Sequence, residues 1–371
     1  MIAPGPLLKK IGHKTSDAVR WAISRGWQPY SRLIPISDSP VWSLWEDMRQ
    51  ITALARQLGI RTVDSSWAGP ATRQSLFFAS QYLLLLAQGR HWGEHRVATA
   101  YFHGKPGSGS PEFDECYENL RRYHAWIQRV QVSHSEMRDI VLETGISPEK
   151  VFMIPIGINL DFFTFSSAES RRKVRALHKI PEQAVVVGSF QKDGVGWGDG
   201  LEPKLIKGPD VLLRTVALLR QRVPELFVLL SGPARGYVKA GLENLGVPYR
   251  HLYLRSYPEV GQFYQALDVY IVSSRQEGGP KAVLESMASG VPLVTTRVGQ
   301  AMDLVQNEKN GWMVESEDFE GLAFWAEYAV RQKTETEEIL KLGRRTAEAN
   351  TYESQLPLWR DFMTGFVNFD A

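Results

Sequence analysis

Two glutamates, Glu277 and Glu285, are eight residues apart on either side of a turn that leads into a helical pattern. The turn contains Gly278–Pro280, and the pattern ends at Gly290, so both ends of the predicted helix carry residues typical of helix ends. Free N–H groups at the start of a helix attract phosphate, and carboxylates accept hydrogen bonds from hydroxyl groups. This order of groups suits a ligand in which two polyols are joined by a diphosphate, as in a nucleotide-sugar.

The elements predicted around this turn form a parallel sheet. In the second half of the chain, strands are predicted at 184–190, 226–232, 251–254, 268–274 and 291–296, and helices at 210–223, 237–245, 258–267 and 280–289. Unbroken apolar strands that alternate with helices are typical of a parallel sheet covered on both faces. We therefore predict a Rossmann-like, doubly wound domain whose strand ends carry the turn.

The first half repeats this pattern less regularly. Its strands are predicted at 32–37, 61–65, 96–103, 129–133 and 151–155, and its helices at 41–58, 71–88, 111–123 and 135–144. The apolar run Ser75–Ala87 is too short and too interrupted to cross a bilayer, so it is interpreted as a buried helix. The predicted fold class is α/β, with two Rossmann-like β/α/β domains, 1–158 and 159–351, that face a central cleft.

The composition limits the class of protein. A chain of 371 residues suggests two domains, at about 150 residues per domain. Basic and acidic residues number 43 and 41, which argues against a dedicated nucleic-acid binder. The single cysteine, Cys116, excludes a disulfide framework and a cysteine-based metal site, and it favours a reducing, cytoplasmic location. No membrane span and no signal peptide are predicted.

The segment EGGPKAVLESMASGVPLVTT, residues 277–296, resembles the Glu-x7-Glu motif of family 4 glycosyltransferases, which have the GT-B fold. The resemblance extends upstream to KGPDVLLRTVALL and LFVLLSGPARG, and downstream to VGQAMDLVQNEKNGWMVESED, where Gln300 replaces a usual glycine. It is strong over Val130–Leu342 and weak before that. It implies a hexosyltransferase of polysaccharide or glycan biosynthesis, a nucleotide-diphosphate-sugar donor and retention of the anomeric configuration. It also implies that a C-terminal helix, 352–371, packs back on the first domain.

The resemblance further implies roles for the residues of the motif. Glu285 is expected to bind the ribose hydroxyls, Glu277 to bind the transferred sugar near its anomeric carbon, and Lys207 to neutralise the departing diphosphate. Backbone N–H groups around Gly278–Val283 are expected to hold the diphosphate. The donor-binding residues expected in this segment are Gly278, Gly279, Pro280, Lys281, Ala282 and Val283.

One position departs from the family pattern. A second basic residue, often Arg, usually follows the glycine of the first strand in the donor domain, but Ser189 stands there in this chain. The glycine-rich insertion QKDGVGWGDGLEPK follows it. We therefore predict that Lys192, within the insertion, supplies the missing charge on the donor side.

The first domain contributes fewer candidates. His103 ends a predicted strand and resembles the family's histidine near the reacting sugar, where it would donate a hydrogen bond to a sugar hydroxyl or to the acceptor. Asp38 ends the first strand and is interpreted either as an acceptor-binding or base residue or as a helix N-cap. Trp42 and Trp45 follow it, and their faces suit sugar rings, although most tryptophans of this half are expected in the core.

The expected partners follow from the same features. The chain contains no Asp-x-Asp motif, and lysines with a helix N-terminus stabilise a departing diphosphate without a metal. We therefore predict no metal, no cofactor and no nucleic acid, and a glycan, lipid-linked or other hydroxyl acceptor. Residues 7–32 carry six basic side chains among apolar ones. They are interpreted as an edge helix of the first domain, and a peripheral contact with the inner face of a membrane stays open.

Two other functions also stay open at this point. An enzyme of the sugar-nucleotide epimerase type has the GT-B fold and acts on the donor with no acceptor. A catalytically silent protein would bind a nucleotide-sugar or a glycan without turnover, which the missing Arg and the weak match of the first domain allow. Incubation of the donor alone separates the epimerase from the transferase, and hydrolysis or transfer above background excludes the silent protein.

Overall fold

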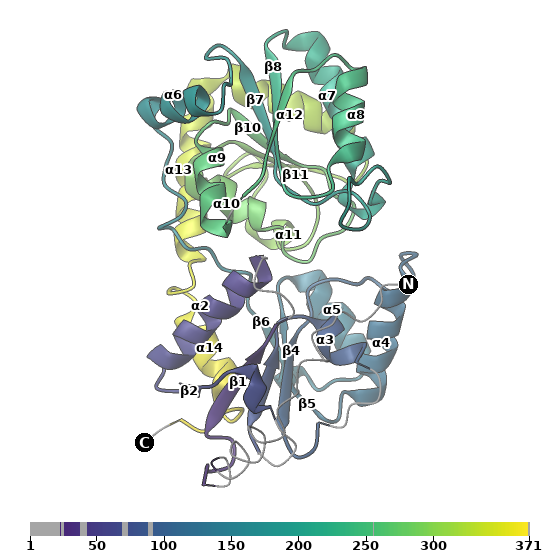
Figure 1. The fold of residues 1–371 in the computed structure, drawn as a ribbon, viewed down its shortest axis with the longest axis vertical. Coiled ribbons are helices and arrows are strands. Elements are labelled where there is room, and N and C mark those ends of the chain that lie inside the picture. Colours follow the sequence, from purple (N-terminus) through teal and green to yellow (C-terminus); the bar gives the residue numbers. More distant parts are fainter. Residues whose placement is uncertain are drawn as a thin grey trace.

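The computed structural model of this chain describes residues 23, 26–37, 43–68, 73–87, 92–254 and 256–369. Within these residues the structure forms two six-stranded parallel sheets, one above the other in Figure 1. The first sheet has the order β2-β1-β3-β4-β5-β6 and consists of β1 (Arg32–Ile36), β2 (Arg61–Thr62), β3 (Ser75–Phe78), β4 (Arg96–Ala100), β5 (Ile127–Val132) and β6 (Val151–Met153).

Helices cover both faces of the first sheet. Successive residues of a strand point to opposite faces, so Leu33 and Ile34 of β1 enter two different hydrophobic clusters. The cluster around Leu33 is completed by α2 (Ser43–Gln57) and α14 (Leu356–Met363). The cluster around Ile34 is completed by α3 (Gln81–Leu85), α4 (Pro111–Tyr123) and α5 (Ser135–Glu143).

The predicted helix over 71–88 is wrong in its first part. Residues Ser75–Phe78 are the strand β3, which pairs with β1 and β4 near the middle of the sheet, and only Gln81–Leu85 are helical. All four residues of β3 are buried because helices cover both faces of the sheet, and Leu76, Phe77 and Phe78 form a continuous apolar run. A short apolar run of this kind has no periodicity that separates a strand from a helix. The hydroxyl of Ser80 then accepts a hydrogen bond from the Tyr82 N–H and caps the helix.

The second sheet has the order β12-β11-β10-β7-β8-β9. Its strands are β7 (Val185–Ser189), β8 (Leu226–Ser231), β9 (Tyr249–Leu252), β10 (Val269–Val272), β11 (Leu293–Thr296) and β12 (Trp312–Val314). The edge strand β12 was not predicted, and β9 begins two residues before the predicted strand. The other strands lie inside their predicted ranges.

Two layers of helices enclose the second sheet. One face is covered by α7 (Pro209–Arg222), α8 (Gly236–Asn244) and α12 (Phe319–Arg331). The other is covered by α9 (Val260–Tyr264), α10 (Lys281–Ser289) and α13 (Lys333–Ala349), with α6 (Ala168–Leu177) and α11 (Ala301–Leu304) beside them. Figure 1 shows α13 running along one side of this domain toward the first sheet.

The chain crosses between the two sheets twice, and the crossings lie side by side. The N–H of Ile158 donates to the Asn350 carbonyl at 3.1 Å, and the N–H of Tyr352 donates to the Ile158 carbonyl at 3.3 Å. After the second crossing, α14 packs on the first sheet, where the ring of Trp359 lies edge-on to that of Phe77 at 5.8 Å between centroids. The C-terminal residues therefore belong to the core of the first half.

The facing edges of the two sheets are also joined directly. The Ser133 hydroxyl donates to the Gly278 carbonyl at 2.7 Å, and the Ser135 hydroxyl donates to the Asp303 carboxylate at 2.6 Å. Gln300, which replaces a usual glycine of the family pattern, accepts a hydrogen bond from the Ile156 N–H at 2.9 Å. This substitution therefore adds a contact between the halves.

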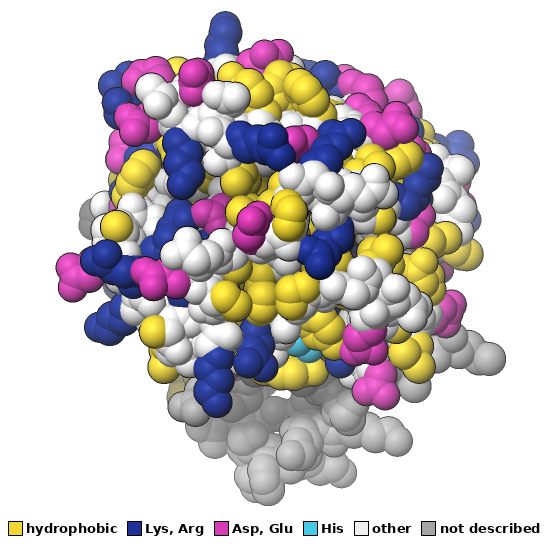
Figure 2. Space-filling view, turned by 90° about the horizontal axis from the view of Figure 1, so that it is seen from above, with side chains coloured by type: hydrophobic (Ala, Val, Ile, Leu, Met, Phe, Trp, Pro, Cys, Tyr) yellow, Lys and Arg dark blue, Asp and Glu magenta, His cyan; other side chains and the backbone are white. Residues whose placement is uncertain are grey.

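Two properties of the described residues bear on possible partners. None of their helices combines the length and the apolar character needed to cross a bilayer. The face seen in Figure 2 carries basic side chains interspersed with acidic ones, so the described residues there form no extended field of one sign. Most of the basic segment 7–32 lies outside the described residues.

Candidate active site

A cavity of about 530 Å³ lies between the two sheets. The first half contributes five residues to its lining: Leu44, Asp47, Phe102, His103 and Ile156. The second half contributes the rest, from the ends of β7, β8 and β10, from the segment after β9 and from the first turns of α10. A cleft of this size at the carboxyl ends of parallel strands is the usual place for a ligand in an open α/β sheet.

Glu277 lies just after β10 and faces this cavity with only 9% of its surface exposed. Its carboxylate accepts a hydrogen bond from the Lys207 ammonium at 2.5 Å and another from the Ser274 hydroxyl at 2.8 Å. Burial alone would raise the pKa of Glu277, but the charge and the hydrogen bond of Lys207 outweigh it, so the net shift is downward. Glu277 is therefore held as a carboxylate.

His103 follows β4 and reaches the same cavity from the first half. Burial, and then the positive charge of Lys207, lower the pKa of His103 to about 4. The ring is therefore neutral at neutral pH and has one N–H donor and one acceptor nitrogen. A neutral imidazole can hydrogen-bond to a hydroxyl group without adding charge to the site.

Lys207 ends a turn of 3₁₀ helix, Leu205–Lys207, and the left-handed residue Gly208 then starts α7. A side chain at position 208 would meet the Ser273 carbonyl at 1.9 Å, so only glycine allows this close approach to the end of β10. The approach brings the Lys207 side chain to Glu277. The family resemblance had implied that these two residues belong to the same site.

Two further lysines line the cavity beside Lys207. Lys192, which was predicted, lies over the Trp197 ring at 4.0 Å. Lys204 was not predicted, and burial, followed by the charges of Lys207 and Lys192, lowers its pKa. Among the described residues, neither Lys192 nor Lys204 has a carboxylate at ion-pair distance. The site therefore holds two cations that an anionic ligand can neutralise.

The insertion that carries these lysines is a hairpin anchored to the second domain. Inside it, the N–H of Lys204 donates to the Asp193 carbonyl at 2.7 Å. Asp193 pairs with Arg235 at 2.9 Å, and both side chains are fully buried. At its tip, the Asp199 carbonyl accepts from the Gly236 N–H at 2.6 Å, which caps the start of α8. The position of Lys204 is thus fixed by tertiary contacts.

Ser189 lies outside the cavity lining that the structure describes. It is 1% exposed, and its carbonyl and hydroxyl oxygens both accept hydrogen bonds from the Arg235 guanidinium, at 2.6 and 3.1 Å. The arginine that the family pattern would place near Ser189 is therefore not replaced by the serine itself. Lysines of the hairpin face the cavity instead.

Glu285 lies inside α10 and lines the cavity with 5% of its surface exposed. One carboxylate oxygen accepts a hydrogen bond from the Tyr257 hydroxyl at 2.5 Å, and the other accepts from the Tyr264 hydroxyl at 2.9 Å. Burial raises the pKa of Glu285, and the two tyrosines and the charge of Lys281 oppose that shift. The two hydroxyls fix the carboxylate in one orientation and leave lone pairs for a ligand.

The predicted phosphate segment divides into two groups. The residues that line the cavity are Gly279, Pro280, Lys281 and Ala282. Gly278 packs against the first half, where an added Cβ would lie 2.2 Å from the Phe102 carbonyl oxygen, and Val283 is fully buried in the core of the second half. The sequence predicted Pro280 as the first residue of this helix. In the structure Pro280 is the N-cap, and α10 begins one residue later, at Lys281.

The acceptor-side predictions fall largely outside the site. Asp38 and Trp42 lie outside the described residues. Trp45 is 36% exposed on α2, where the Arg49 guanidinium lies over its ring at 5.0 Å, and it is absent from the described cavity lining. The same helix instead presents Leu44 and Asp47, whose place on the first turns of α2 gave no signal in the sequence.

Among the residues that the structure describes, no three His, Cys, Asp or Glu side chains form a group that could hold a metal ion. The carboxylates of the cavity are each engaged by lysine, serine or tyrosine side chains.

Comparisons with known proteins agree with this architecture. Residues 201–345 match the family model described as Glycosyl transferases group 1. A D-inositol 3-phosphate glycosyltransferase from Corynebacterium diphtheriae is 31% identical over 196 residues, which are 49% of this chain and 43% of that protein. The chain spans about half the length of the curated relatives that it matches at this level.

Solved structures cover nearly the whole chain. HepE from Anabaena, in complex with UDP and glucose, superposes with a TM-score of 0.72 at 16% identity, over 91% of this chain and all of HepE. Sucrose-phosphate synthase from Thermosynechococcus elongatus superposes with a TM-score of 0.70 at 17% identity, over 90% of this chain and all of the synthase. The chain therefore has the GT-B fold, with two facing Rossmann-like sheets, which confirms the fold predicted from its sequence.

Proposed function

We propose that this protein is a glycosyltransferase that moves a sugar from a nucleotide-diphosphate-sugar to an acceptor hydroxyl, with the Glu-x7-Glu site of family 4 enzymes. One observation carries the proposal: Lys192 and Lys204 face the cavity beside Lys207 and Glu277, and no carboxylate of the described residues pairs with either of them. Both lysines are partly buried, so their charges have lost part of their water without gaining a counter-ion from the described residues. A bound diphosphate supplies that counter-ion.

The charge of the site supports a donor without a metal. The three lysines at this end of the cavity outnumber Glu277 by two positive charges. A nucleotide-sugar carries two negative charges on its diphosphate, so lysines of this chain balance it. When the bond to the sugar breaks, negative charge grows on the departing diphosphate, and lysines already in place stabilise it.

The remaining groups are placed for the two ends of such a donor. In this proposal Glu285, oriented by its two tyrosines, binds the ribose hydroxyls. Glu277 and the neutral His103 bind hydroxyls of the transferred sugar near the bond that breaks. In this proposal the acceptor attacks on the face that the diphosphate leaves, which retains the anomeric configuration. The departing diphosphate itself accepts the proton of the acceptor hydroxyl.

The acceptor is proposed to enter from the first half, whose contribution to the cavity is Leu44, Asp47, Phe102 and Ile156 with His103. Curated relatives are named D-inositol 3-phosphate glycosyltransferases, so D-inositol 3-phosphate is a first acceptor to test, followed by glycan and lipid-linked alcohols. UDP-glucose, which is bound in a HepE structure, is the first donor to test.

Calorimetric titration of nucleotide-sugars tests the proposal. Lys204→Ala is expected to weaken donor binding by at least about tenfold, since a charged hydrogen bond contributes roughly 1.5–3 kcal/mol. Lys341→Ala, which removes an exposed lysine paired with the exposed Glu338, is the matched control and should bind as the wild type does. Equal affinity in both variants would contradict the site.

Product analysis separates the three functions. A sugar transferred to an added acceptor identifies the transferase. A new isomer formed from the donor alone identifies the epimerase, and donor binding with neither hydrolysis nor transfer identifies the silent binding protein. Either of the last two results overturns the proposed reaction but leaves the donor site in place.

A further inference from the structure

Gln81, the first residue of α3, is a buried glutamine whose side chain reaches the chain just beyond β4. Its amide oxygen accepts a hydrogen bond from the Phe102 N–H at 3.4 Å, and its amide nitrogen donates to the His103 carbonyl at 2.8 Å. Gln81 is absent from the described lining of the large cavity, whereas His103 is part of it. Gln81 is therefore connected to the site through this stretch of backbone.

The chain has already left the sheet where Gln81 contacts it. Strand β4 ends at Ala100, and neither Phe102 nor His103 belongs to a strand. The Gln81 amide pairs one backbone donor and one backbone acceptor that lie beyond the hydrogen-bond ladder of the sheet. Its orientation is fixed, because a turned amide would place its nitrogen against an N–H and its oxygen against a carbonyl oxygen.

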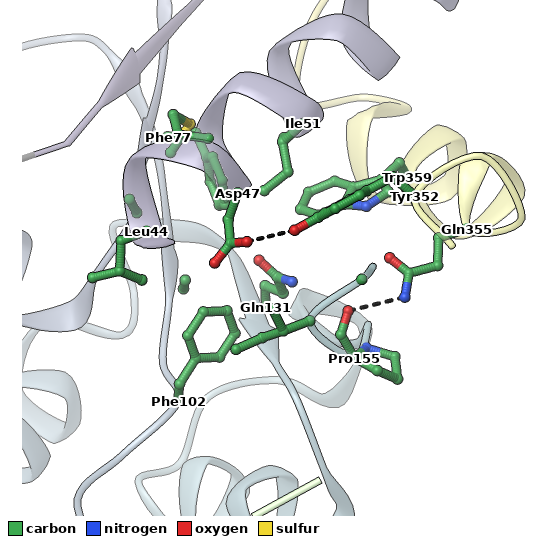
Figure 3. Close-up of a pocket in the computed structure, with 15 residues that line it drawn as sticks. Leu44, Asp47, Ile51, Phe77, Phe102, Gln131, Pro155, Tyr352, Gln355 and Trp359 are labelled. Carbon is green, nitrogen blue, oxygen red and sulfur yellow. Dashed lines mark hydrogen bonds between the residues drawn. The ribbon is translucent and has the colours of Figure 1, made fainter. Parts of the chain in front are cut away.

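The side chains of the two residues that Gln81 holds lie on different faces of the first sheet. The Phe102 ring belongs to the hydrophobic cluster on the α2 face, and Figure 3 shows it turned toward Asp47. The His103 ring instead stacks on Tyr82 of α3, with 6.4 Å between the ring centroids and 22° between the ring planes. Tyr82 directly follows Gln81, so two successive residues of one helix contact the backbone and the ring of His103.

Among the groups that the structure describes, none makes a hydrogen bond to the imidazole ring of His103. The direction of the ring therefore depends on the backbone that carries it and on the stacking contact. The same backbone also meets the second half, since the Phe102 carbonyl oxygen would lie 2.2 Å from a Cβ added to Gly278. Gln81 from the first half and Gly278 from the second thus confine one short segment beside Glu277.

We propose that Gln81 is a positioning residue of the transfer reaction, whose amide fixes the backbone of Phe102 and His103 so that the His103 ring is directed at a hydroxyl of the transferred sugar beside Glu277. This inference rests on the proposed function, because the reaction gives the ring its task. The amide is neutral, so it holds the segment without changing the charge of the cleft. A displacement of about 1 Å in a group near the reacting bond can lower a rate about a hundredfold.

Gln81→Met, which removes both hydrogen bonds and keeps the length of the side chain, tests the proposal. We expect kcat to fall about tenfold to a hundredfold, while the calorimetric donor affinity changes little because the lysines and Glu285 stay in place. Gln74→Met is the matched control, since Gln74 is equally buried at the start of β3, accepts from the Arg32 N–H and donates to the Gln28 carbonyl. Wild-type kcat in Gln81→Met, or an equal loss in both variants, contradicts the proposal.

A double-mutant cycle separates positioning from a general loss of structure. His103→Ala is expected to lower kcat by itself, and the addition of Gln81→Met should then lower it little further, because the ring that Gln81 positions is gone. The same fractional loss in both backgrounds would mean that Gln81 does not act through His103. Gln81→Asn keeps the amide but shortens its reach by a methylene group, so a smaller loss of kcat is expected, and it replaces Gln81→Met if that variant does not fold.

NMR of ¹⁵N-labelled histidine rings gives a test that needs neither donor nor activity. The ring signals of His103, assigned by their loss in His103→Ala, are expected to shift in Gln81→Met and to stay in place in Gln74→Met. Unchanged His103 signals in Gln81→Met would overturn the positioning role. A wild-type protein that transfers no sugar would instead overturn the proposed function, so the two failures are distinguishable.

Discussion

The Lys281 ammonium pairs with the Asp47 carboxylate across the cleft, between the first turn of α10 and the first turns of α2. Both side chains are about nine-tenths buried, and the Tyr352 hydroxyl donates to the same carboxylate oxygen. This ion pair joins the two sheets at a point where one partner also lines the donor end of the cavity.

Removal of one partner should destabilise the protein more than removal of both. Asp47→Leu is expected to lower the free energy of unfolding by about 3 kcal/mol, because it leaves a buried ammonium without a counter-charge. Asp47→Leu combined with Lys281→Met should recover most of that loss. Urea unfolding measures both variants, and Glu136→Gln, which breaks the exposed pair with Lys105, is the control with little expected effect.

The orientation of Glu285 should control the pH dependence of donor binding. Burial raises the pKa of Glu285, and the hydrogen bond from Tyr257 counters that rise. Tyr257→Phe should therefore raise the pKa further, so donor affinity is lost at a higher pH as the solution is acidified. Calorimetry over a pH series measures the midpoint, and Tyr249→Phe, which removes a surface hydrogen bond to Glu243, should leave it in place.

Acid should destabilise the fold through His103. The pKa of His103 is lowered from 6.5 to about 4, first by burial, so the unfolded state binds more protons between these values. The free energy of unfolding is expected to fall as the pH drops through this window, by about 3 kcal/mol from this residue. His103→Gln should show a shallower decrease. His134 is shifted in the same direction, so His134→Gln is measured beside it.

Gly278 should tolerate no side chain. A Cβ at this position would lie 2.2 Å from the Phe102 carbonyl oxygen, which is backbone and cannot move aside. Gly278→Ala is therefore expected to push the two halves apart and to lower turnover at least tenfold with a modest change in stability. Gly26→Ala, whose nearest new contact is at 3.7 Å, is the control. Wild-type turnover in Gly278→Ala would show that the close approach is unimportant for the reaction.

Removal of divalent metal should leave turnover unchanged. Three lysines rather than a metal face the proposed diphosphate end of the cavity, so excess chelator is expected to have no effect on the rate. The measurement compares initial rates with and without chelator at a fixed donor concentration. Complete loss of activity that magnesium restores would contradict this prediction.

The site residues that sequence reasoning could reach are those fixed by local structure. Glu277 and Glu285 lie on one strand–turn–helix unit, and a strand end followed by a glycine turn gives their relative position directly. His103 was reached in the same way, as a residue at the end of a strand. Lys207 entered through the family resemblance, and its meeting with Glu277 needed the close approach at Gly208.

Site residues whose positions depend on tertiary contacts could not be predicted from the sequence. Lys204 reaches the cavity because Asp193 and Arg235 pair inside the second domain, and no local pattern announces that pair. Asp47 faces the cleft only because α2 is oriented by its packing on the first sheet and on α14. The strand β3 was missed for a related reason, since burial on both faces removes the alternation that identifies a strand.

The hairpin that carries Lys204 lies between β7 and α7, apart from the strand–turn–helix unit that holds the two glutamates. One segment of the chain therefore contributes positive charge to the cavity, and a different segment positions the two carboxylates. Exchange of this hairpin alone would change how strongly the cleft attracts an anion, while the positions of Glu277 and Glu285 would stay as they are. Substitutions confined to the hairpin should therefore change the affinity of the cavity for the proposed donor while the rest of the fold stays unchanged.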